Sequence, residues 1–170
     1  MKKILRWLSI LPALLFPLII FGFSSQTGSE SGSLSYSLCK IILKYFDRLF
    51  SLDLSVWEIN SYAMSFHILI RKLAHVTEYF LLSFCVFLPF RVWFYNPEAP
   101  KPRKELIRKA IIPSFLISLC YASADELLQS FVPGRHGTPI DVLIDSIGIT
   151  LGCALLMIIY TKKNKHPDKY

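Results

Sequence analysis

Four apolar segments, each long enough to cross a lipid bilayer, constrain the fold of this chain more than any other feature. They run from about residue 4 to 23, 71 to 94, 110 to 131 and 140 to 160. A helix of about 20 apolar residues crosses a hydrocarbon core of about 30 Å, and a spanning helix satisfies its own backbone hydrogen bonds. The sequence therefore predicts an all-α integral membrane protein with four transmembrane helices, formed by a single membrane domain over residues 1–170.

The charge distribution predicts the topology of these spans. The formal net charge is +7, and the basic residues are concentrated before the first span, between residues 91 and 109, and after the fourth span. With four spans, these three segments lie on one side of the membrane, and Lys and Arg accumulate in cytoplasmic loops. We therefore expect both termini to be cytoplasmic, and topology accounts for the basic excess without a nucleic acid partner.

The first apolar segment also has an alternative interpretation as a cleaved signal peptide. Gly22 and Ser24 are small residues of the kind found before a cleavage site. The apolar run is longer than the hydrophobic core of about 7–15 residues that signal peptides carry. We therefore favour a retained helix, in which Pro12 and Pro17 are tolerable.

The connection between the first two spans contains a predicted external helix. Residues 24–33 are rich in Ser and Gly and predict an exposed loop. Residues 34–50 place apolar side chains such as Leu38 and Ile42 at helical spacing, with Lys40 and Lys44 among the residues of the other face. This pattern predicts an amphipathic helix lying in the membrane interface, and packing against the other spans is the alternative.

Ionisable residues interrupt the outer turns of the last three spans. They are Arg71, Lys72, His75 and Glu78, with Tyr79, in the second span; Asp125 and Glu126, with Gln129, in the third; Asp141 and Asp145 in the fourth; and Arg135 in the last loop. Charged groups are costly in hydrocarbon, so one shared polar pocket facing outward is the simplest packing that shields them all. Snorkelling of Arg71 and Lys72, and purely structural ion pairs, are the alternatives.

Two sequence blocks carry a resemblance to a known family. The block from Arg71 to Tyr79 and the block from Asp125 to Arg135, followed by the segment from Asp141 to Gly152, resemble the VanZ-like family, as does the turn Ser24-Ser25-Gln26 after the first span. The family pattern falls on Lys72, His75, Tyr79, Asp125, Glu126, Gln129, Arg135, Asp141 and Gly148. Asp145 stands where family members often carry Asn, so the resemblance does not support a catalytic role for it. The resemblance implies a small bacterial cytoplasmic membrane protein and a link to resistance against the glycopeptide teicoplanin.

Three functions are consistent with such a pocket. The first is an enzyme acting on a phosphate-bearing envelope lipid or lipid-linked cell-wall precursor. Its catalytic candidates are Glu126, Asp125, His75 and Glu78, and its substrate-binding candidates are Lys72, Arg71, Tyr79, Gln129, Arg135, Asp141 and Asp145. The second is binding of a precursor, glycopeptide or lipid head group without chemistry. The third is a transporter, which the lack of an internal repeat disfavours.

The sequence does not identify a cofactor. The HExxH zinc signature is absent, and we expect no dedicated metal site. His75 and Glu78 are three residues apart, a spacing that can place two ligands on one ion, so a divalent cation held with carboxylates stays open as an alternative. Membrane lipids are the expected partners, and the oligomeric state is left open.

Overall fold

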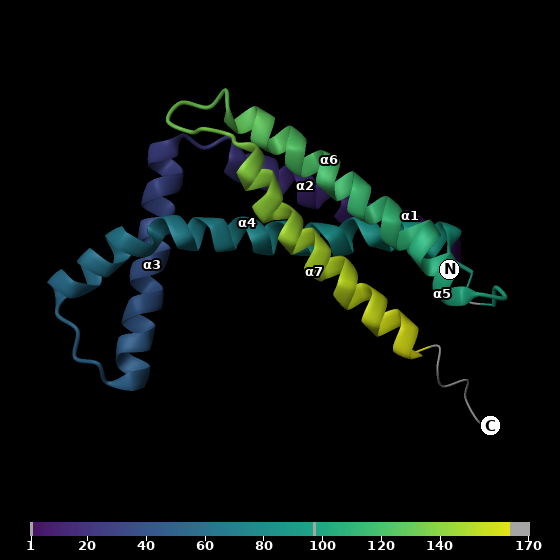
Figure 1. Ribbon diagram of the computed structural model, residues 1–170, viewed down its shortest axis with the longest axis horizontal. Coiled ribbons are helices and arrows are strands. Elements are labelled where there is room, and N and C mark those ends of the chain that lie inside the picture. The colour runs from purple at the N-terminus through teal and green to yellow at the C-terminus, as the bar shows by residue number, and fades with distance from the viewer. Residues whose placement is uncertain (1, 97, 164–170) are drawn as a thin grey trace.

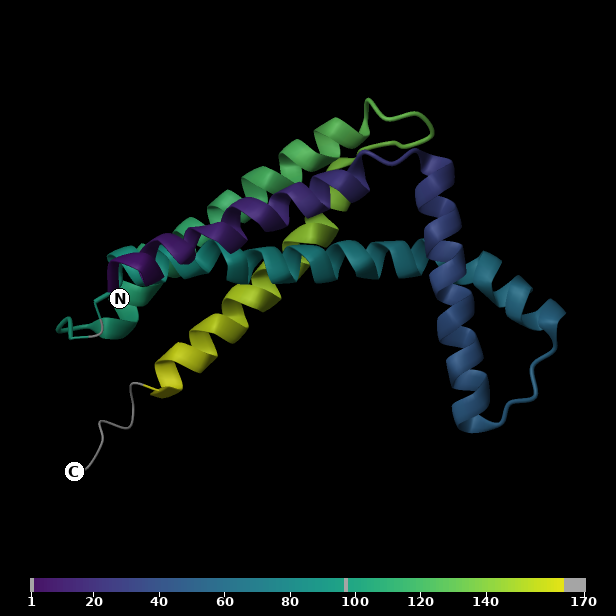
Figure 2. The ribbon, with the colours of Figure 1, turned by 180° about the vertical axis from the view of Figure 1, so that it is seen from behind.

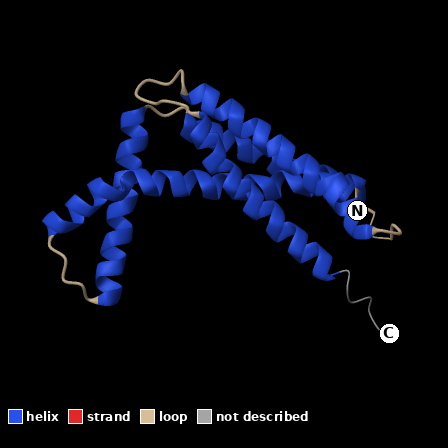
Figure 3. Cartoon of the chain, viewed as in Figure 1, coloured by secondary structure: helices blue, strands red, loops and turns tan. Residues whose placement is uncertain are grey.

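The computed structural model describes residues 2–96 and 98–163, and their regular structure is helical throughout (Figure 3). The elements are α1 (Lys2–Leu8), α2 (Ile10–Ser24), α3 (Gly28–Phe50), α4 (Val56–Phe94), α5 (Pro102–Leu106), the π-helical turn η1 (Ile107–Ile111), α6 (Ile112–Gln129) and α7 (Pro139–Lys163). The part of the predicted basic tail from residue 164 on lies outside the described residues.

The four predicted spans are confirmed. Four helical segments are long and apolar enough to cross a membrane, namely Arg6–Ser24, Val56–Phe94, Pro102–Gln129 and Pro139–Tyr160. The helix that contains the second span extends well before residue 71, the predicted start of the span. The helix begins at Val56, because Ser55 and Glu58 form a capping box in which Ser55 Oγ accepts from the Glu58 amide and Glu58 Oε2 accepts from the Ser55 amide.

The predicted exposed loop over residues 24–33 is partly wrong, because α3 begins at Gly28. Thr27 caps this helix, and its side chain and amide exchange hydrogen bonds with Glu30 in a second capping box. The predicted amphipathic helix over residues 34–50 lies within α3. One face of α3, with Ser35 and Cys39, is buried, and α3 packs against α4. Packing against the other spans, which the sequence left open as an alternative, is therefore observed for this face. The position of α3 in the membrane interface stays a prediction.

The two longest helices cross at close range. In Figures 1 and 2, α7 runs diagonally across α4, while α2 and α6 lie side by side on the other side of the bundle. A Cβ atom on Gly148 would overlap the Val76 carbonyl, and one on Gly152 would overlap Ser83. Small residues four apart allow two helix backbones to approach closely in membranes. The predicted role of these glycines in helix contact is confirmed.

The helix bundle has two distinct ends. The N-terminus and α5 lie at one end of the bundle, and the loop between α6 and α7 lies at the opposite end (Figure 1). At this second end the start of α3 meets the same loop, since the Gly28 amide donates to the Pro133 carbonyl at 3.0 Å. Gly134 has φ +72°, which a side chain would strain, and a Cβ on Gly28 would overlap the Gly134 carbonyl. The turn between α2 and α3 and the loop between α6 and α7 are therefore joined through their backbones.

Candidate functional site

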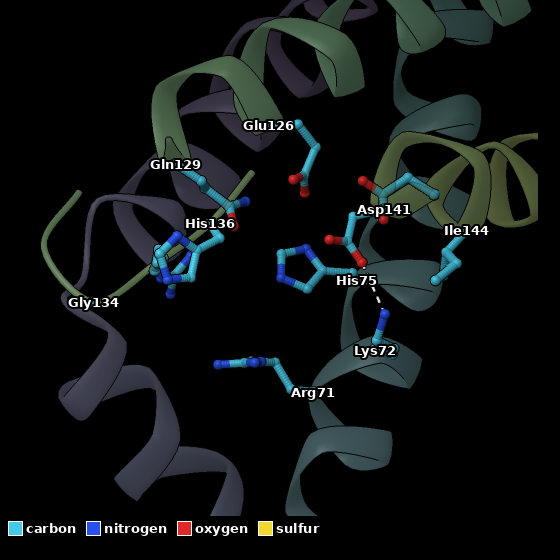
Figure 4. Close-up of a pocket in the computed structure, with 11 residues that line it drawn as sticks. Arg71, Lys72, His75, Glu126, Gln129, Gly134, His136, Asp141 and Ile144 are labelled. Carbon is cyan, nitrogen blue, oxygen red and sulfur yellow. Dashed lines mark hydrogen bonds and ion pairs between the residues drawn. The ribbon is translucent and has the colours of Figure 1, made fainter. Parts of the chain in front are cut away.

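A cavity of about 210 Å³ lies beside this junction, between α4, α6, α7 and the α6–α7 loop. We call it the polar cavity. Its lining residues are Arg71, Lys72, His75, Glu126, Gln129, Gly134, Arg135, His136, Asp141, Ile144 and Asp145 (Figure 4). Most of the residues that the sequence predicted for the site therefore meet in one cavity. Asp125, Tyr79 and Glu78 do not line it.

One lysine of the polar cavity is neutralised by a neighbouring carboxylate. Lys72 Nζ of α4 contacts Asp141 Oδ1 of α7 at 2.8 Å, the contact drawn in Figure 4. The other oxygen of Asp141 accepts a hydrogen bond from the Thr138 hydroxyl at 2.8 Å. Thr138 Oγ1 also accepts from the Asp141 amide at 3.2 Å, as a helix N-cap does, and so fixes the carboxylate at the start of α7. Lys72 and Asp141 lie at the rim of the polar cavity. Because their charges cancel, they add little net charge to it.

Two arginines supply positive charge that is not neutralised in this way. Among the residues that the structure describes, neither Arg71 nor Arg135 has an ion-pair partner. Arg135 Nη2 donates to the Phe23 carbonyl at 3.0 Å, and its buried Nε atom has no hydrogen-bond partner in the described part of the chain. Burial, and then the positive charge of Arg71, lower the pKa of the Arg135 guanidinium, although arginine stays charged at neutral pH. An anion between the two arginines would relieve this repulsion.

The acidic wall of the polar cavity is formed by α6 and α7. Glu126 is 6% exposed and its Oε2 atom accepts from the Thr138 amide at 3.3 Å. Asp145 is 1% exposed, and its Oδ2 atom has no hydrogen-bond partner among the described residues. Glu126 also lines a second cavity of about 390 Å³ between α6 and α7, which we call the α6–α7 cavity. These carboxylates and the two arginines line the same cavity.

Asp125 lies behind the cavity wall and joins three helices. Its Oδ2 atom accepts from Ser24 Oγ of α2 at 2.7 Å, from the Tyr79 hydroxyl of α4 at 3.0 Å and from Gln129 Nε2 at 3.0 Å. Asp125 is 4% exposed and Tyr79 is fully buried. The three donors to Oδ2 make Asp125 a link between α2, α4 and α6, while its buried Oδ1 atom has no hydrogen-bond partner among the described residues. The family resemblance included Ser24, but sequence reasoning did not place it beside Asp125, which is about 100 positions away along the chain.

His75 and Glu78 lie where the polar cavity meets an apolar groove. His75 lines both, whereas Glu78 lines only the groove. His75 Nδ1 is 3.7 Å from Glu78 Oε2, and neither of these buried atoms has a hydrogen-bond partner among the described residues. In that part of the chain, no group of three or more His, Cys, Asp and Glu side chains is arranged to hold a metal ion. Sequence reasoning also missed His136 as a lining residue, although it lies in the loop between two predicted site blocks.

Four helices of membrane-spanning length, three of which line a cavity of mixed charge together with the α6–α7 loop, define a polytopic membrane protein. The family model described as VanZ/LLP1 matches residues 9–160, and the chain belongs to this family. The family assignment suggested by the two sequence blocks is therefore confirmed. No match was found among curated proteins, and none among solved structures.

Proposed function

We propose that this protein binds the phosphate-bearing head group of an envelope lipid, or of a lipid-linked cell-wall precursor, in the polar cavity and acts on it there. The observation that carries the proposal is the pair Arg71 and Arg135, which line one cavity without an ion-pair partner among the described residues. Guanidinium groups bind phosphate through paired hydrogen bonds and are preferred where such recognition is needed.

The size of the polar cavity supports a head group rather than a whole antibiotic. Its volume of about 210 Å³ is below the roughly 300–1,000 Å³ of pockets that enclose drug-sized molecules. A phosphate with a small substituent fits this space, whereas a glycopeptide is far larger. Any effect on teicoplanin would then act through the bound lipid. We propose to measure teicoplanin susceptibility in a bacterial host that expresses the parent protein or Arg71→Gln, and only the parent should raise resistance.

The arrangement of the helix ends supports an outward-facing site in the bacterial cytoplasmic membrane. The basic residues of α1 and α5, including Arg6 and Arg103, lie at the end of the bundle opposite the polar cavity (Figure 1). Positive residues accumulate on the cytoplasmic side. The cavity would then meet lipid head groups in the outer leaflet, where envelope precursors are used.

Glu126 is the residue best placed for chemistry on the bound phosphate. It faces the polar cavity, is almost fully buried and makes one long hydrogen bond, to the Thr138 amide. Across the cavity lies His75, whose Nδ1 atom is 3.7 Å from Glu78 Oε2 and makes no hydrogen bond among the described residues. An acid and a base on opposite sides of a phosphate can give and take protons at its oxygens. Non-catalytic binding would use the same arginines and would not need Glu126, so a substitution of Glu126 separates the two functions experimentally.

The test uses the purified full-length protein in detergent, with methyl phosphate as a soluble ligand and dodecyl phosphate as a lipid ligand. Binding is measured by calorimetry and phosphate release by a colorimetric assay. Arg71→Gln should weaken methyl phosphate binding about 10-fold or more, because hydrogen bonds between charged groups contribute about 1.5–3 kcal/mol. Arg103→Gln, at the other end of the bundle, is the matched control. Unchanged binding in Arg71→Gln would refute the proposal.

Glu126→Gln distinguishes reaction from binding. If the protein acts on lipid phosphate, this variant should retain binding and lose phosphate release. A parent protein that binds both phosphates and releases none would support the non-catalytic function instead.

A further inference from the structure

A mostly apolar groove of about 410 Å³ lies beside the polar cavity, between α3 and α4. We call it the α3–α4 groove. Its apolar walls include Leu34, Leu38 and Ile41 of α3 and Ile70 and Ala74 of α4. Leu38 is 43% exposed and Ile41 is 64% exposed, so the groove is open along its length to the surroundings of the helices. In a membrane protein those surroundings include hydrocarbon.

The groove and the polar cavity share part of their lining. Arg71, His75 and Arg135 line both. If the anionic group of a molecule contacts the two arginines, the atoms bonded to that group therefore lie at the start of the α3–α4 groove. This arrangement is complementary to an amphiphile in which an anionic group and a hydrocarbon chain are directly connected.

We propose that the α3–α4 groove holds the hydrocarbon chain of the lipid whose phosphate occupies the polar cavity, so that the ligand is a lipid phosphate with its chain bonded directly to the phosphate oxygen. This inference rests on the proposed phosphate-binding function and identifies the class of lipid. A lipid with a bulky sugar between phosphate and chain does not match, because the shared residues leave no separate compartment for the sugar.

The floor of the groove suits a hydrocarbon chain although it contains serines. The Ser35 hydroxyl donates to the carbonyls of Ser31 and Gly32, both at 3.0 Å. Ser35 therefore keeps its hydrogen bonds within α3 and offers no unpaired donor to the groove. The start of α3 is also fixed to the α6–α7 loop through the Gly28 amide and the Pro133 carbonyl. The groove therefore begins next to Arg135 at a defined position.

A competing exit for the chain is the α6–α7 cavity, which is lined by Leu127 and Val142. A chain that left by this route would pull the phosphate toward Glu126, which lines that cavity and the polar cavity alike. In the described part of the chain, the α6–α7 cavity has no basic lining residue to offset the repulsion between Glu126 and a phosphate drawn toward it. The α3–α4 groove is lined by a carboxylate, Glu78, but also by Arg71, Arg135 and His75, so charge favours that route.

The experiment blocks each route while leaving the phosphate site intact. Lipid tails are about as apolar as leucine side chains, so chain length in detergent is a weak readout and steric blocking is used instead. Ala74→Trp fills the α3–α4 groove, and Leu127→Trp fills the α6–α7 cavity as the matched control. Binding of dodecyl phosphate and of methyl phosphate is measured for each variant of the full-length protein.

We expect Ala74→Trp to weaken dodecyl phosphate binding about 10-fold, the effect of about 1.4 kcal/mol, and to leave methyl phosphate binding unchanged. Leu127→Trp should change neither. Leu38→Glu, on the opposite wall of the groove, should reproduce the effect of Ala74→Trp, with Leu49→Glu on the same helix as its control. These two variants keep the test valid if the tryptophan disturbs folding.

The outcomes separate this inference from the proposed function. Unchanged dodecyl phosphate binding in both groove variants, or a loss in Leu127→Trp, would overturn the groove assignment while methyl phosphate still binds. A parent protein that binds neither phosphate would overturn the proposed function itself. A dodecyl phosphate that carries a diazirine at its chain end should cross-link to α3 residues of the groove, and cross-links confined to α6 and α7 would overturn the assignment.

Discussion

The close crossing of α4 and α7 leads to a quantitative prediction for Gly148. A Cβ atom at this position would overlap the backbone carbonyl of Val76, which cannot rotate away as a flexible side chain can. Forcing extra volume into a packed interface costs about 1–3 kcal/mol. The same substitution to alanine improves helix propensity by about 0.8–1.0 kcal/mol, so Gly148→Ala combines a steric loss with a propensity gain.

Gly22→Ala isolates the steric part of this effect. Gly22 lies in α2, and a Cβ there would meet nothing within 4 Å. Because both variants gain helix propensity, the difference between them reports the overlap alone. At about 2–4 °C per kcal/mol for a chain of this size, we expect Gly148→Ala to unfold roughly 2–12 °C below Gly22→Ala.

Thermal unfolding in detergent can be followed with a thiol-reactive dye in a Cys120→Ser background, because Cys120 is exposed whereas Cys39 and Cys153 are buried in the folded protein. The same crossing places Lys72 against Asp141, so Gly148→Ala should also weaken methyl phosphate binding, while Gly22→Ala should not. Equal unfolding temperatures for the two variants would refute the close approach of α4 and α7.

Three further predictions concern support, pH and topology. Asp125→Leu leaves three buried donors without their acceptor, and the same thermal assay should show a loss of about 1–3 kcal/mol or more. Hydrogen bonds from Thr27 lower the pKa of Glu30. The stabilisation of α3 by the Glu30 carboxylate is therefore complete above about pH 4.5 and is lost as the pH falls through the lowered pKa. An NMR titration should show this pKa rising in Thr27→Ala. In an otherwise cysteine-free protein in intact cells, a membrane-impermeant maleimide should label His136→Cys and not Lys101→Cys, and the reverse pattern would contradict the orientation.

The fold could be predicted from sequence where hydrophobic length decides the structure. Runs of about 20 apolar residues leave few alternatives to spanning helices, and all four were found. The starts of α3 and α4 were missed, although the spacings Thr27 to Glu30 and Ser55 to Glu58 are capping-box signatures. The hydropathy around these positions did not reveal the two helix starts, because a capping box acts through backbone hydrogen bonds and leaves no mark on hydropathy.

The candidate site could be predicted as a group of residues and not as individual roles. The cost of a charge in hydrocarbon was enough to expect the arginines and carboxylates to converge. It could not distinguish Asp125 from Glu126, which are adjacent on α6 and point to different neighbours. Their difference depends on the position of α2, whose Ser24 binds Asp125. That packing depends on side chains far apart in the sequence and has no local pattern.

The central claim is that Arg71 and Arg135 together hold a phosphate in the polar cavity. Solid-state NMR can measure this contact directly, through dipolar dephasing of ¹⁵N-labelled arginine side chains by the ³¹P nucleus of bound methyl phosphate. We predict dephasing of guanidinium nitrogens in the parent protein, reduced in Arg71→Gln and in Arg135→Gln and unchanged in Arg103→Gln. Bound phosphate with no guanidinium dephasing, or dephasing that survives both substitutions, would contradict the account.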